Sequence, residues 1–588
     1  MVLLRKLLTT LFSNAFELCG FDRKFGKVVI SQRPELGQFQ CNGALALANI
    51  QRKNPRRIAQ EVIDVLEHRE VFSDISLADP GFINITLSDE FLVSQVQEIA
   101  KDERLGCSII SNPKNVIIDF GGPNMAKPMH VGHLRSTIIG DSLQRLFRFM
   151  GNHVKSDIHL GDWGTQVGML ICELRRQQPD LPYFDISYTE PYPKELKVAI
   201  TDLEEMYSNA YTLCKNSEKE MKAALKATME FQQGQPGYRA LWSYFRDISV
   251  KELKEDFGNL GVTFDLWQGE SHYRDRIPAM IEKLRANGHA KMSEGALVIH
   301  LTKESDKKEI PPFILVKSNG GYLYSTSDLA TIEERVDDFK VDLILYVVDK
   351  RQSLHFEQVF RAACQTGMVN DTKLEHIAFG TVNGPDGKPF KTRAGGVMKL
   401  KDLISMTIDE ALKQMKKIGI AESYNDLERL NIAKKVSIAA LKFADLMNPR
   451  TSDYIFDLKK FTKFEGCTGP YLLYSGVRVK SILRKASNKG IILGSILSPT
   501  SCIERNLMLE LCQFSDAVQN VYFLRAPNYL CDFVYNLAQI FSCFYEQCHI
   551  LREKDPDLQS SWLALSQVYL HELELVLFLL GIEIPDKM

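Results

Sequence analysis

The segment between residues 115 and 150 constrains the fold of this chain more than any other. It begins with the apolar run Asn115-Val-Ile-Ile-Asp-Phe120, continues through the loop Gly121-Gly-Pro-Asn124, and ends in a stretch from His130 to Met150 with helical periodicity. A nearly continuous apolar run is typical of a strand that is buried on both faces of a parallel sheet, and parallel strands need crossover connections. The segment therefore predicts the opening of a doubly wound α/β domain.

The length of the chain requires several domains, because 588 residues exceed the size at which one hydrophobic core stops growing. We expect an α+β domain at residues 1–110, a Rossmann-type α/β domain at 111–400 and an all-α bundle at 401–588. A charged, helical stretch at about 175–290 is predicted to be an insertion in the α/β domain. The second half of that domain is expected to contain strands at 314–316, 343–348 and 376–380.

Several classes of protein are excluded or disfavoured by composition. The 72 Lys+Arg and 74 Asp+Glu leave a net charge of −2, so a nucleic-acid surface would have to be a local patch. The 12 Cys include no CxxC pair, which favours reduced core thiols and a cytoplasmic protein. No apolar stretch approaches the roughly 18 residues of a membrane helix, and the leucines of the first twelve residues recur at helical spacing, which favours a helix over a targeting peptide. A P-loop ATPase is excluded because Gly-x4-Gly-Lys-Ser/Thr is absent.

The motif His130-Val-Gly132-His133 lies between the predicted strand and the predicted helix. A helix N-terminus presents unpaired N–H groups and partial positive charge to a phosphate, Gly132 permits close approach, and both imidazoles can donate to phosphate oxygens. The arrangement, with Pro123 and Lys127 in the preceding loop, resembles the nucleotide-binding signature of class I aminoacyl-tRNA synthetases. Two exposed histidines at a helix start are the alternative, and a metal site is disfavoured because no third ligand stands at suitable spacing.

Class I synthetases carry a second signature, a mobile lysine loop, for which the chain offers two candidates. Lys291-Met-Ser-Glu294 matches three of the first four residues of the family's Lys-Met-Ser-Lys-Ser signature. However, Glu294 would aim a carboxylate at pyrophosphate, and the segment precedes the second half of the domain. We interpret it as a surface turn. Lys388, Lys391 and Arg393 follow the 376–380 strand on a glycine-rich loop, where they are expected to close over the β,γ-phosphates. A solvated basic hairpin is the alternative.

A candidate pocket for a cationic substrate combines a helix with a strand end. Tyr324 and Asp328 stand at i and i+4 on one helix face, and Gln352 follows the 343–348 strand at the carboxyl edge where α/β folds bind ligands. A buried carboxylate beside a phenol suits a guanidinium or an ammonium group.

The chain resembles the arginyl-tRNA synthetase family of the bacterial type. The motifs that carry the resemblance are Asp119 to His133, Gly161-Asp-Trp-Gly-Thr-Gln166, Tyr324 to Ala330, Gln352 to Phe356, and Gly387 to Arg393. The resemblance implies that ATP contacts Pro123, Lys127, His130, Gly132, His133 and the lysine loop, and that arginine is held by Tyr324, Asp328 and Gln352 at its guanidinium and by Asn124 and Asp119 at its α end. Asp119 stands where the family usually has Glu. Mg²⁺ is expected with ATP, and no metal bound by the protein is expected.

Both ends of the chain contain candidate tRNA contacts. Residues 37–48 resemble part of the family's tRNA-elbow domain, and residues 451–474 and 579–588 resemble its anticodon-binding domain. The candidate contacts combine basic groups for phosphates with rings for unstacked bases, and they are Arg52, Lys53, Arg56, Arg57, Tyr471, Tyr474 and Arg478. A solvated helix start is the alternative for the basic residues, and core packing for the tyrosines.

We therefore expect a cytoplasmic, monomeric arginine–tRNA ligase that binds L-arginine, ATP and tRNA(Arg) and does not bind a membrane. The expected fold is a class I Rossmann-type catalytic domain with a helical insertion, an amino-terminal α+β domain and a carboxy-terminal all-α bundle. The alternatives are a synthetase for another amino acid and a catalytically silent relative. Asp328 argues for a cationic substrate, and the paired lysines and histidines argue against a silent relative.

Overall fold

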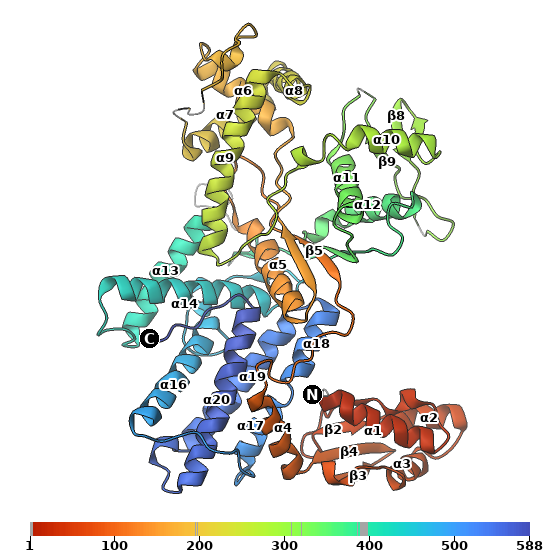
Figure 1. Ribbon diagram of the computed structural model, residues 1–588, viewed down its shortest axis with the longest axis vertical. Helices are drawn as coiled ribbons and strands as arrows, with labels where there is room; N and C mark the ends of the chain where they lie inside the picture. Colours follow the sequence, from red (N-terminus) through yellow and green to blue (C-terminus); the bar gives the residue numbers. More distant parts are fainter. Residues whose placement is uncertain are drawn as a thin grey trace. The chain divides into compact units, whose positions relative to one another are not determined.

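The computed structural model describes residues 4–193, 196, 198–306, 308–318, 320–384, 386–388 and 398–588 (Figure 1). The chain forms two compact units, which are described separately. The first contains Met1–Ile110, Lys416–Ala439 and Lys463–Met588, and the second contains Ser111–Met415 and Ala440–Thr462.

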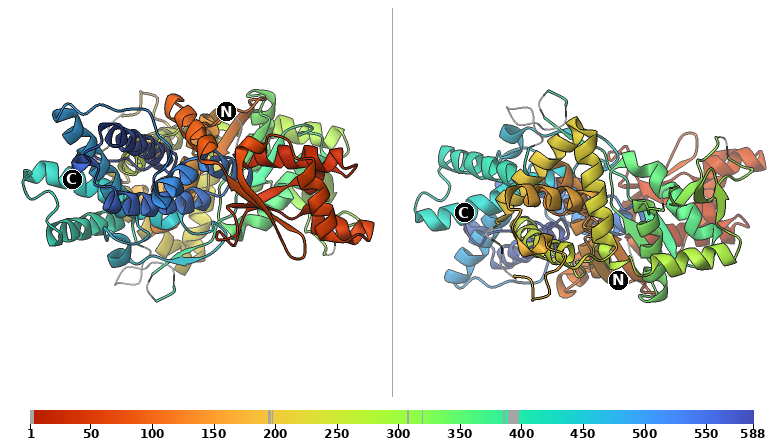
Figure 2. Two further views of the ribbon diagram at one scale, coloured as in Figure 1. Left: turned by 90° about the horizontal axis from the view of Figure 1, so that it is seen from below. Right: turned by 90° about the horizontal axis from the view of Figure 1, so that it is seen from above.

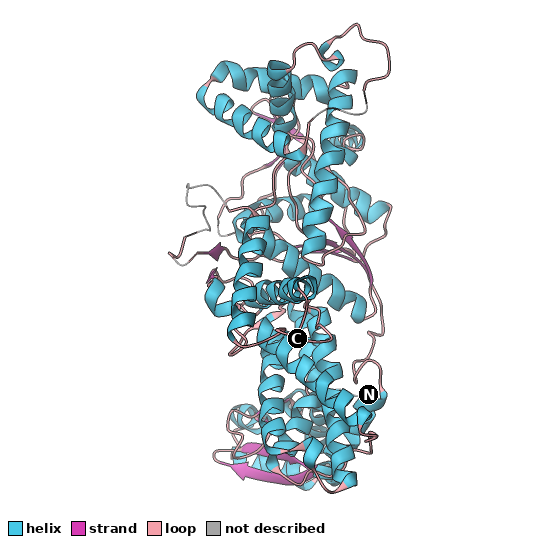
Figure 3. Cartoon of the chain, turned by 90° about the vertical axis from the view of Figure 1, so that its left-hand side faces the viewer, coloured by secondary structure: helices cyan, strands magenta, loops and turns pink. Residues whose placement is uncertain are grey.

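The amino-terminal part of the first unit is an α+β domain. It consists of helices packed beside a four-stranded antiparallel sheet of order β1-β2-β4-β3 (Figure 3). The helix expected in the first twelve residues is confirmed from Leu4 onward, and Leu4, Leu8 and Leu11 are buried in the core. The elements are α1 (Leu4–Leu18), β1 (Val28–Ile30), β2 (Phe39–Cys41), α2 (Gly43–Gln51), α3 (Pro55–Asp64), β3 (Phe72–Ala78), β4 (Phe82–Leu87) and α4 (Asp89–Lys101).

The rest of the first unit is a helical bundle, as expected. Helix α4 packs on it, and Arg505 forms an ion pair with Asp89 at 2.7 Å. Its long helices are α16 (Gly469–Asn488), α17 (Cys502–Leu511), α18 (Phe514–Leu524), α19 (Asn528–Gln547) and α20 (Pro556–Leu579). Contrary to expectation, α20 is long and apolar enough to cross a membrane. However, 67% of its apolar 18-residue segment is buried, because the helix packs against α16, α17 and α19.

The second unit is built on a four-stranded parallel sheet of order β11-β10-β5-β6. The expected buried strand is confirmed, and the sequence order of its neighbours reverses between β5 and β10, which is where open α/β sheets bind ligands. The strands are β5 (Asn115–Asp119), β6 (His153–Asp157), β10 (Leu343–Tyr346) and β11 (Lys373–His376), and the helices that follow β5 and β10 are α5 (Val131–Phe149) and α12 (Ser353–Gln365). The last strand of this sheet, β11, ends at His376. The predicted strand at 376–380 is therefore wrong except for its first residue.

The insertion after β6 is mainly helical. Helix α6 (Thr165–Gln177) contacts α7 (Ile200–Asn216), α8 (Glu218–Gln232) and α9 (Pro236–Asn259), the long helix in yellow in Figure 2. Helix α10 (Ile277–Ala286) follows, and then a three-stranded antiparallel sheet of β7 (Lys291–Ser293), β8 (Ala296–Ile299) and β9 (Phe313–Val316).

Strand β9 corrects our prediction that residues 314–316 belong to the nucleotide-binding sheet. It pairs antiparallel with β8, and its side chains alternate between buried Phe313 and Leu315 and exposed Ile314. That alternation is typical of an antiparallel strand with one solvated face, whereas a central parallel strand is apolar throughout. Lys291 lies in strand β7, and the turn falls on Glu294 and Gly295, both at positive φ.

The carboxy-terminal region is not purely helical, because β13 (Tyr454–Ile455) pairs in parallel with β12 (Val382–Asn383). Helices α13 (Leu400–Lys417) and α14 (Asp426–Leu446) precede it. The end of α14 is joined to α5 by two buried ion pairs, Arg135 with Asp445 at 2.9 Å and Lys442 with Asp141 at 3.1 Å. Residues 440–462 therefore belong to the same compact unit as the parallel sheet.

Candidate active site

The histidine motif forms a capping box at the start of α5. The backbone N–H of Gly132 donates to His130 Nδ1 at 3.0 Å, the backbone N–H of His130 donates to His133 Nδ1 at 3.1 Å, and the two rings stack at 3.9 Å. Because both Nδ1 atoms are acceptors, each neutral ring carries its proton on Nε2. A side chain at position 132 would lie 2.7 Å from the His130 ring, so glycine is needed there.

Both histidines are neutral at pH 7. Burial and the nearby charge of Lys127 lower the pKa of His130, and burial, His130 and Lys127 lower the pKa of His133 to about 3. The ammonium of Lys127 lies 4.6 Å from the centre of the Tyr207 ring of α7. The helix start therefore offers two neutral imidazole donors beside one cation, which is suited to an anionic ligand.

The lysine-loop segment returns to the histidine motif. Lys388 is exposed, and its backbone N–H donates to Asp386. Lys391 and Arg393 lie outside the described residues. Where the description resumes, Val131 donates to the carbonyl of Met398 at 3.1 Å and Leu400 donates to that of Met129 at 2.8 Å. Residues 398–400, which follow the loop in the chain, are thus bonded to the segment around His130.

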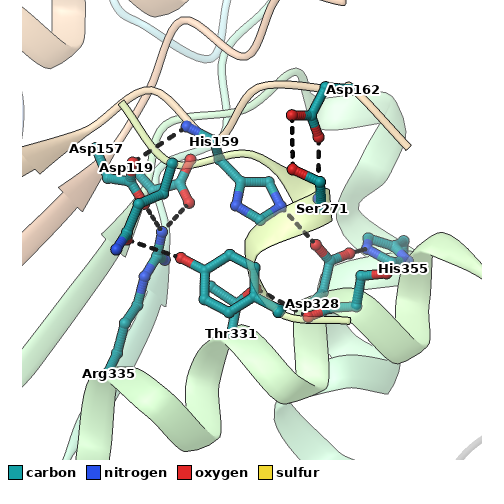
Figure 4. A network of polar contacts seen from close by, with 12 residues as sticks. Asp119, Asp157, His159, Asp162, Ser271, Asp328, Thr331, Arg335 and His355 are labelled. Atoms are coloured by element: carbon teal, nitrogen blue, oxygen red, sulfur yellow. Dashed lines mark hydrogen bonds and ion pairs between the residues drawn. The ribbon is translucent and has the colours of Figure 1, made fainter. Parts of the chain in front are cut away.

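A buried ion cluster occupies the carboxyl ends of β5 and β6 (Figure 4). Arg335 of α11 (Tyr324–Asp337) contacts Asp119 and Asp157 through one nitrogen, at 2.7 Å each. Burial raises the pKa of Asp119, and the charges of Arg335 and His159 oppose that shift. Asp119, predicted to contact the substrate's α end, is therefore already paired with a cation of the protein.

The two carboxylates also lie, together with His159, at distances that are typical of metal ligands. The ligand atoms of Asp119, Asp157 and His159 lie within 4.8 Å of one another. The guanidinium of Arg335 bridges the two carboxylates and already supplies the positive charge that a metal would bring.

Asp328 is held by two histidines. His355 Nε2 lies 2.7 Å from one carboxylate oxygen and His159 Nε2 lies 3.5 Å from the other (Figure 4). Burial would raise the pKa of Asp328, but its interactions with His159 and His355 lower it to about 2, so the group is ionised. Tyr324, expected beside Asp328, is 57% exposed, and its ring centre lies 4.8 Å from that of His355.

His159 carries the charge that balances this pocket. Burial would lower its pKa, but the interaction with Asp328 and the charges of Asp119 and Asp328 raise it to about 9. A second carboxylate, Glu270, is nearby: burial and the charges of Asp328 and Asp162 raise its pKa to about 7 against the opposing charge of His159.

Sequence reasoning missed His159, Glu270, Arg335 and the role of His355. One signal was available for His159, which lies two residues beyond the end of β6 and thus at the ligand-binding edge. Ionised Asp328 also required partners, and His355 stood in a motif already singled out.

The remaining predicted pocket residues lie near the strand ends. Asn124 forms a bridge with Gly161, where a side chain would fall 2.2 Å from the Asn124 amide oxygen. Pro123 is buried, and its carbonyl accepts from the backbone of Gly161 at 3.1 Å. Gln352 is exposed and closes the short turn after β10.

The predicted tRNA contacts lie in the first unit. The basic cluster is free of acids in sequence but not in space, because Arg56 pairs with Asp79 and Arg57 pairs with Glu61. Arg52 and Lys53 are exposed.

The aromatic candidates of the bundle are half-buried. The Tyr471 hydroxyl lies 3.4 Å from the carbonyl of Ala538, and the Arg478 guanidinium lies 4.8 Å from the Tyr474 ring centre and 5.3 Å from that of Tyr545. Intramolecular packing therefore accounts for much of their surface.

Comparison with known proteins gives one consistent result along the whole chain. Residues 5–87 match the family described as Arginyl tRNA synthetase N terminal domain, residues 95–458 match tRNA synthetases class I (R), catalytic domain, and residues 472–588 match DALR anticodon binding domain.

Proteins of known name are similar over their full length. The chain is 49% identical to the arginine–tRNA ligase of Hyphomonas neptunium over 591 residues and 47% identical to that of Alkaliphilus oremlandii over 590 residues, with 100% of both partners covered in each case. The solved arginyl-tRNA synthetase of Plasmodium falciparum is 26% identical, with a TM-score of 0.82 and 100% of both chains covered.

Proposed function

This chain belongs to the arginyl-tRNA synthetase family and is an arginine–tRNA ligase, and we propose that the residues around α5 and α11 carry out its chemistry. The arginine carboxylate attacks the α-phosphate of ATP and releases pyrophosphate, and a hydroxyl of the terminal adenosine of tRNA(Arg) then takes the arginyl group. No protein nucleophile is required, so catalysis rests on positioning and electrostatic stabilisation. The observation that carries the assignment is an ionised, largely enclosed Asp328, with 20% of its side chain exposed, at the same sheet edge as a phosphate-suited helix start.

In the ATP half of the site, His130 and His133 donate their Nε2 protons to phosphate oxygens and Gly132 and Pro123 shape the approach. Lys388, Lys391 and Arg393, with Lys127, neutralise the charge that develops on pyrophosphate. The tether at Met398 supports this role, because it returns the loop to the α5 start. Mg²⁺ enters with ATP, whose phosphate oxygens are the ligands that it prefers.

In the arginine half of the site, Asp328 accepts the substrate guanidinium. We expect Tyr324 and Gln352, which are both exposed, to close over the bound side chain, and Asn124 and Asp119 to contact its α end. Glu270 adds a second carboxylate that ionises more readily once a cation is bound. We also propose that the chain acts as a cytoplasmic monomer. None of the twelve cysteines forms a disulfide, as that location requires, although Cys364, Cys502 and Cys543 are exposed and are not core thiols.

Arginine should bind more tightly as pH rises from 7 to 9. His159, with its pKa raised to about 9, is protonated at pH 7, and a guanidinium placed against Asp328 brings a second cation beside it. Binding therefore favours release of the His159 proton, and by linkage affinity rises with pH, by at most about tenfold per unit.

The measurement is the arginine dissociation constant at pH 7, 8 and 9 for the natural chain and for His159→Gln. The substrate's own α-ammonium titrates in both proteins, so the difference between the two curves isolates His159. Parallel curves would show that His159 keeps its proton and would refute the coupling.

Arginine-dependent exchange of pyrophosphate into ATP should require tRNA. The family implies this dependence, and in the free chain the carboxylates are occupied by His159, His355 and Arg335. RNA bound at both ends of the chain can supply the energy that rearranges these pairs. The assay compares exchange with and without tRNA(Arg), and strong exchange without tRNA would contradict the prediction.

A further inference from the structure

One face of helix α7 contacts both of the segments that flank the histidine motif, within the second unit. Glu204 and Tyr207 stand at i and i+3 in α7 and therefore share a face of the helix. The ammonium of Lys127 lies over the Tyr207 ring, 4.6 Å from its centre, and the ammonium of Lys399 donates to the Glu204 carboxylate at 2.5 Å. Lys127 lies three residues before His130, and Lys399 forms an antiparallel β-bridge with His130. The insertion therefore contacts the start of α5 through two lysines.

The backbone next to Lys127 is also held by the insertion. The N–H of Ala126 donates to the hydroxyl of Ser249 in α9 at 3.0 Å, and that hydroxyl donates to the carbonyl of Phe245 at 2.7 Å. Ala126 and Ser249 are both buried, and Ala126 has a φ of +58°, a conformation that residues other than glycine rarely adopt. These contacts fix the point from which the Lys127 side chain extends.

The two lysines differ in the charge of their partners. The carboxylate of Glu204 neutralises Lys399 and occupies one of its N–H donors. Lys127 lies over a neutral ring, and no carboxylate of the described residues forms an ion pair with it. A cation–π contact holds an ammonium through the quadrupole of the ring, so it leaves the full charge and the remaining N–H groups available to an anion.

The Tyr207 ring is itself fixed in place. It is half-buried against the apolar core between α6, α7 and α8, and it stacks on the ring of Tyr211, with 6.1 Å between the ring centres. Its hydroxyl has no hydrogen-bond partner within the described ranges of the chain, so the ring face is the part of the side chain that makes the contact. A fixed ring limits the positions open to the long lysine side chain and lowers the entropy cost of ordering it on a ligand.

We propose that Tyr207 is a positioning residue for the ATP step, which holds the ammonium of Lys127 at the start of α5 without neutralising it. The proposal rests on the proposed function, because that function gives Lys127 its phosphate ligand. Glu204, on the same face of α7, has the complementary effect, because it cancels the charge of Lys399 opposite His130. Helix α7 thus determines which of the two lysines meets the phosphates and where that lysine lies.

The test measures tRNA-dependent exchange of pyrophosphate into ATP by the full chain, with the ATP concentration varied. Tyr207→Leu removes the ring, and Tyr207→Phe keeps the ring face and removes only the hydroxyl. Lys127→Met removes the ammonium, and the double variant combines it with Tyr207→Leu. The matched control is Tyr211→Leu, the same change about one helical turn further on, at a side chain that is 51% exposed.

Tyr207→Leu should lower kcat/KM for ATP by roughly 2- to 30-fold, which is the range of a cation–π contact between its exposed and desolvated limits. The KM for arginine should stay unchanged, because Asp328 is held by His159 and His355 instead. Tyr207→Phe should retain most of the rate, Tyr211→Leu should have no effect, and Lys127→Met should cost more than Tyr207→Leu. In the chain that lacks the Lys127 ammonium, Tyr207→Leu should cause no further loss.

Four results would overturn the proposal. Equal losses from Tyr207→Leu with and without the Lys127 ammonium, or an equal loss from Tyr211→Leu, would show that the ring only packs the insertion. A loss from Tyr207→Phe as large as that from Tyr207→Leu would assign the effect to the hydroxyl, and an unchanged kcat/KM in Tyr207→Leu would remove the ring from the ATP step. An unchanged rate in Lys127→Met would instead refute the phosphate role that the proposed function gives to Lys127, and this proposal with it.

Discussion

Replacing Asp328 by Asn should lower kcat/KM for arginine by roughly 30- to several-thousand-fold. The asparagine keeps the shape of the side chain but removes the only carboxylate that the segment from Tyr324 to Ala330 places on the α11 face of Tyr324. Truncating one partner of a buried, hydrogen-bonded charge pair costs about 2–5 kcal/mol, which corresponds to that range. The carboxylate is ionised, with its pKa lowered to about 2, so the full charge is lost at any assay pH.

The control for this variant is citrulline, which has a neutral urea in place of the guanidinium. Citrulline never forms the charge pair, so its much weaker reaction should be penalised far less by the mutation. Equal losses for both substrates would indicate general damage, for example through released His159 and His355, and an unchanged reaction with arginine would remove Asp328 from substrate recognition.

Lys388→Ala and Lys391→Ala should each reduce the rate of adenylate formation by two to three orders of magnitude. Each lysine is expected to contact an oxyanion that gains charge as pyrophosphate leaves, and removing one such contact costs about 2.7–4 kcal/mol. The matched control is Lys291→Ala, which removes the same charge from β7, a strand of the separate antiparallel sheet. Rates of tRNA-dependent pyrophosphate exchange measure the effect.

The opposite pattern would refute the assignment of the loop. If Lys291→Ala abolished exchange while Lys388→Ala and Lys391→Ala did not, the segment that begins at Lys291 would be the functional lysine loop. The return of the chain at Met398 to Val131 would then be a structural contact only.

Features that depend on neighbouring residues could be predicted from the sequence. The β5 strand, the loop and the α5 helix follow from one apolar run and one helical period, and the helix start at His130 follows from its place after the loop. Strand β9 could not be assigned correctly, because a run of four apolar residues does not distinguish a parallel from an antiparallel partner.

The charge network of the pocket was beyond sequence reasoning for a different reason. Arg335 is 216 residues from Asp119 in the chain, and His159 is 169 residues from Asp328 (328 − 159), so only the fold brings these charges together. The same holds for Arg56, whose partner Asp79 lies 23 residues away in the chain. Their pairing reduces the positive charge of a cluster that contains no acidic residue in sequence.

Aminoacylation with each of the twenty amino acids, using bulk tRNA and ATP, tests the central claim most directly. The ionised Asp328 between two histidines predicts that arginine alone is attached, and that lysine, which cannot match a carboxylate with two parallel N–H groups, is not. Charging of a neutral amino acid, or of none in the presence of tRNA and Mg²⁺, would contradict the account.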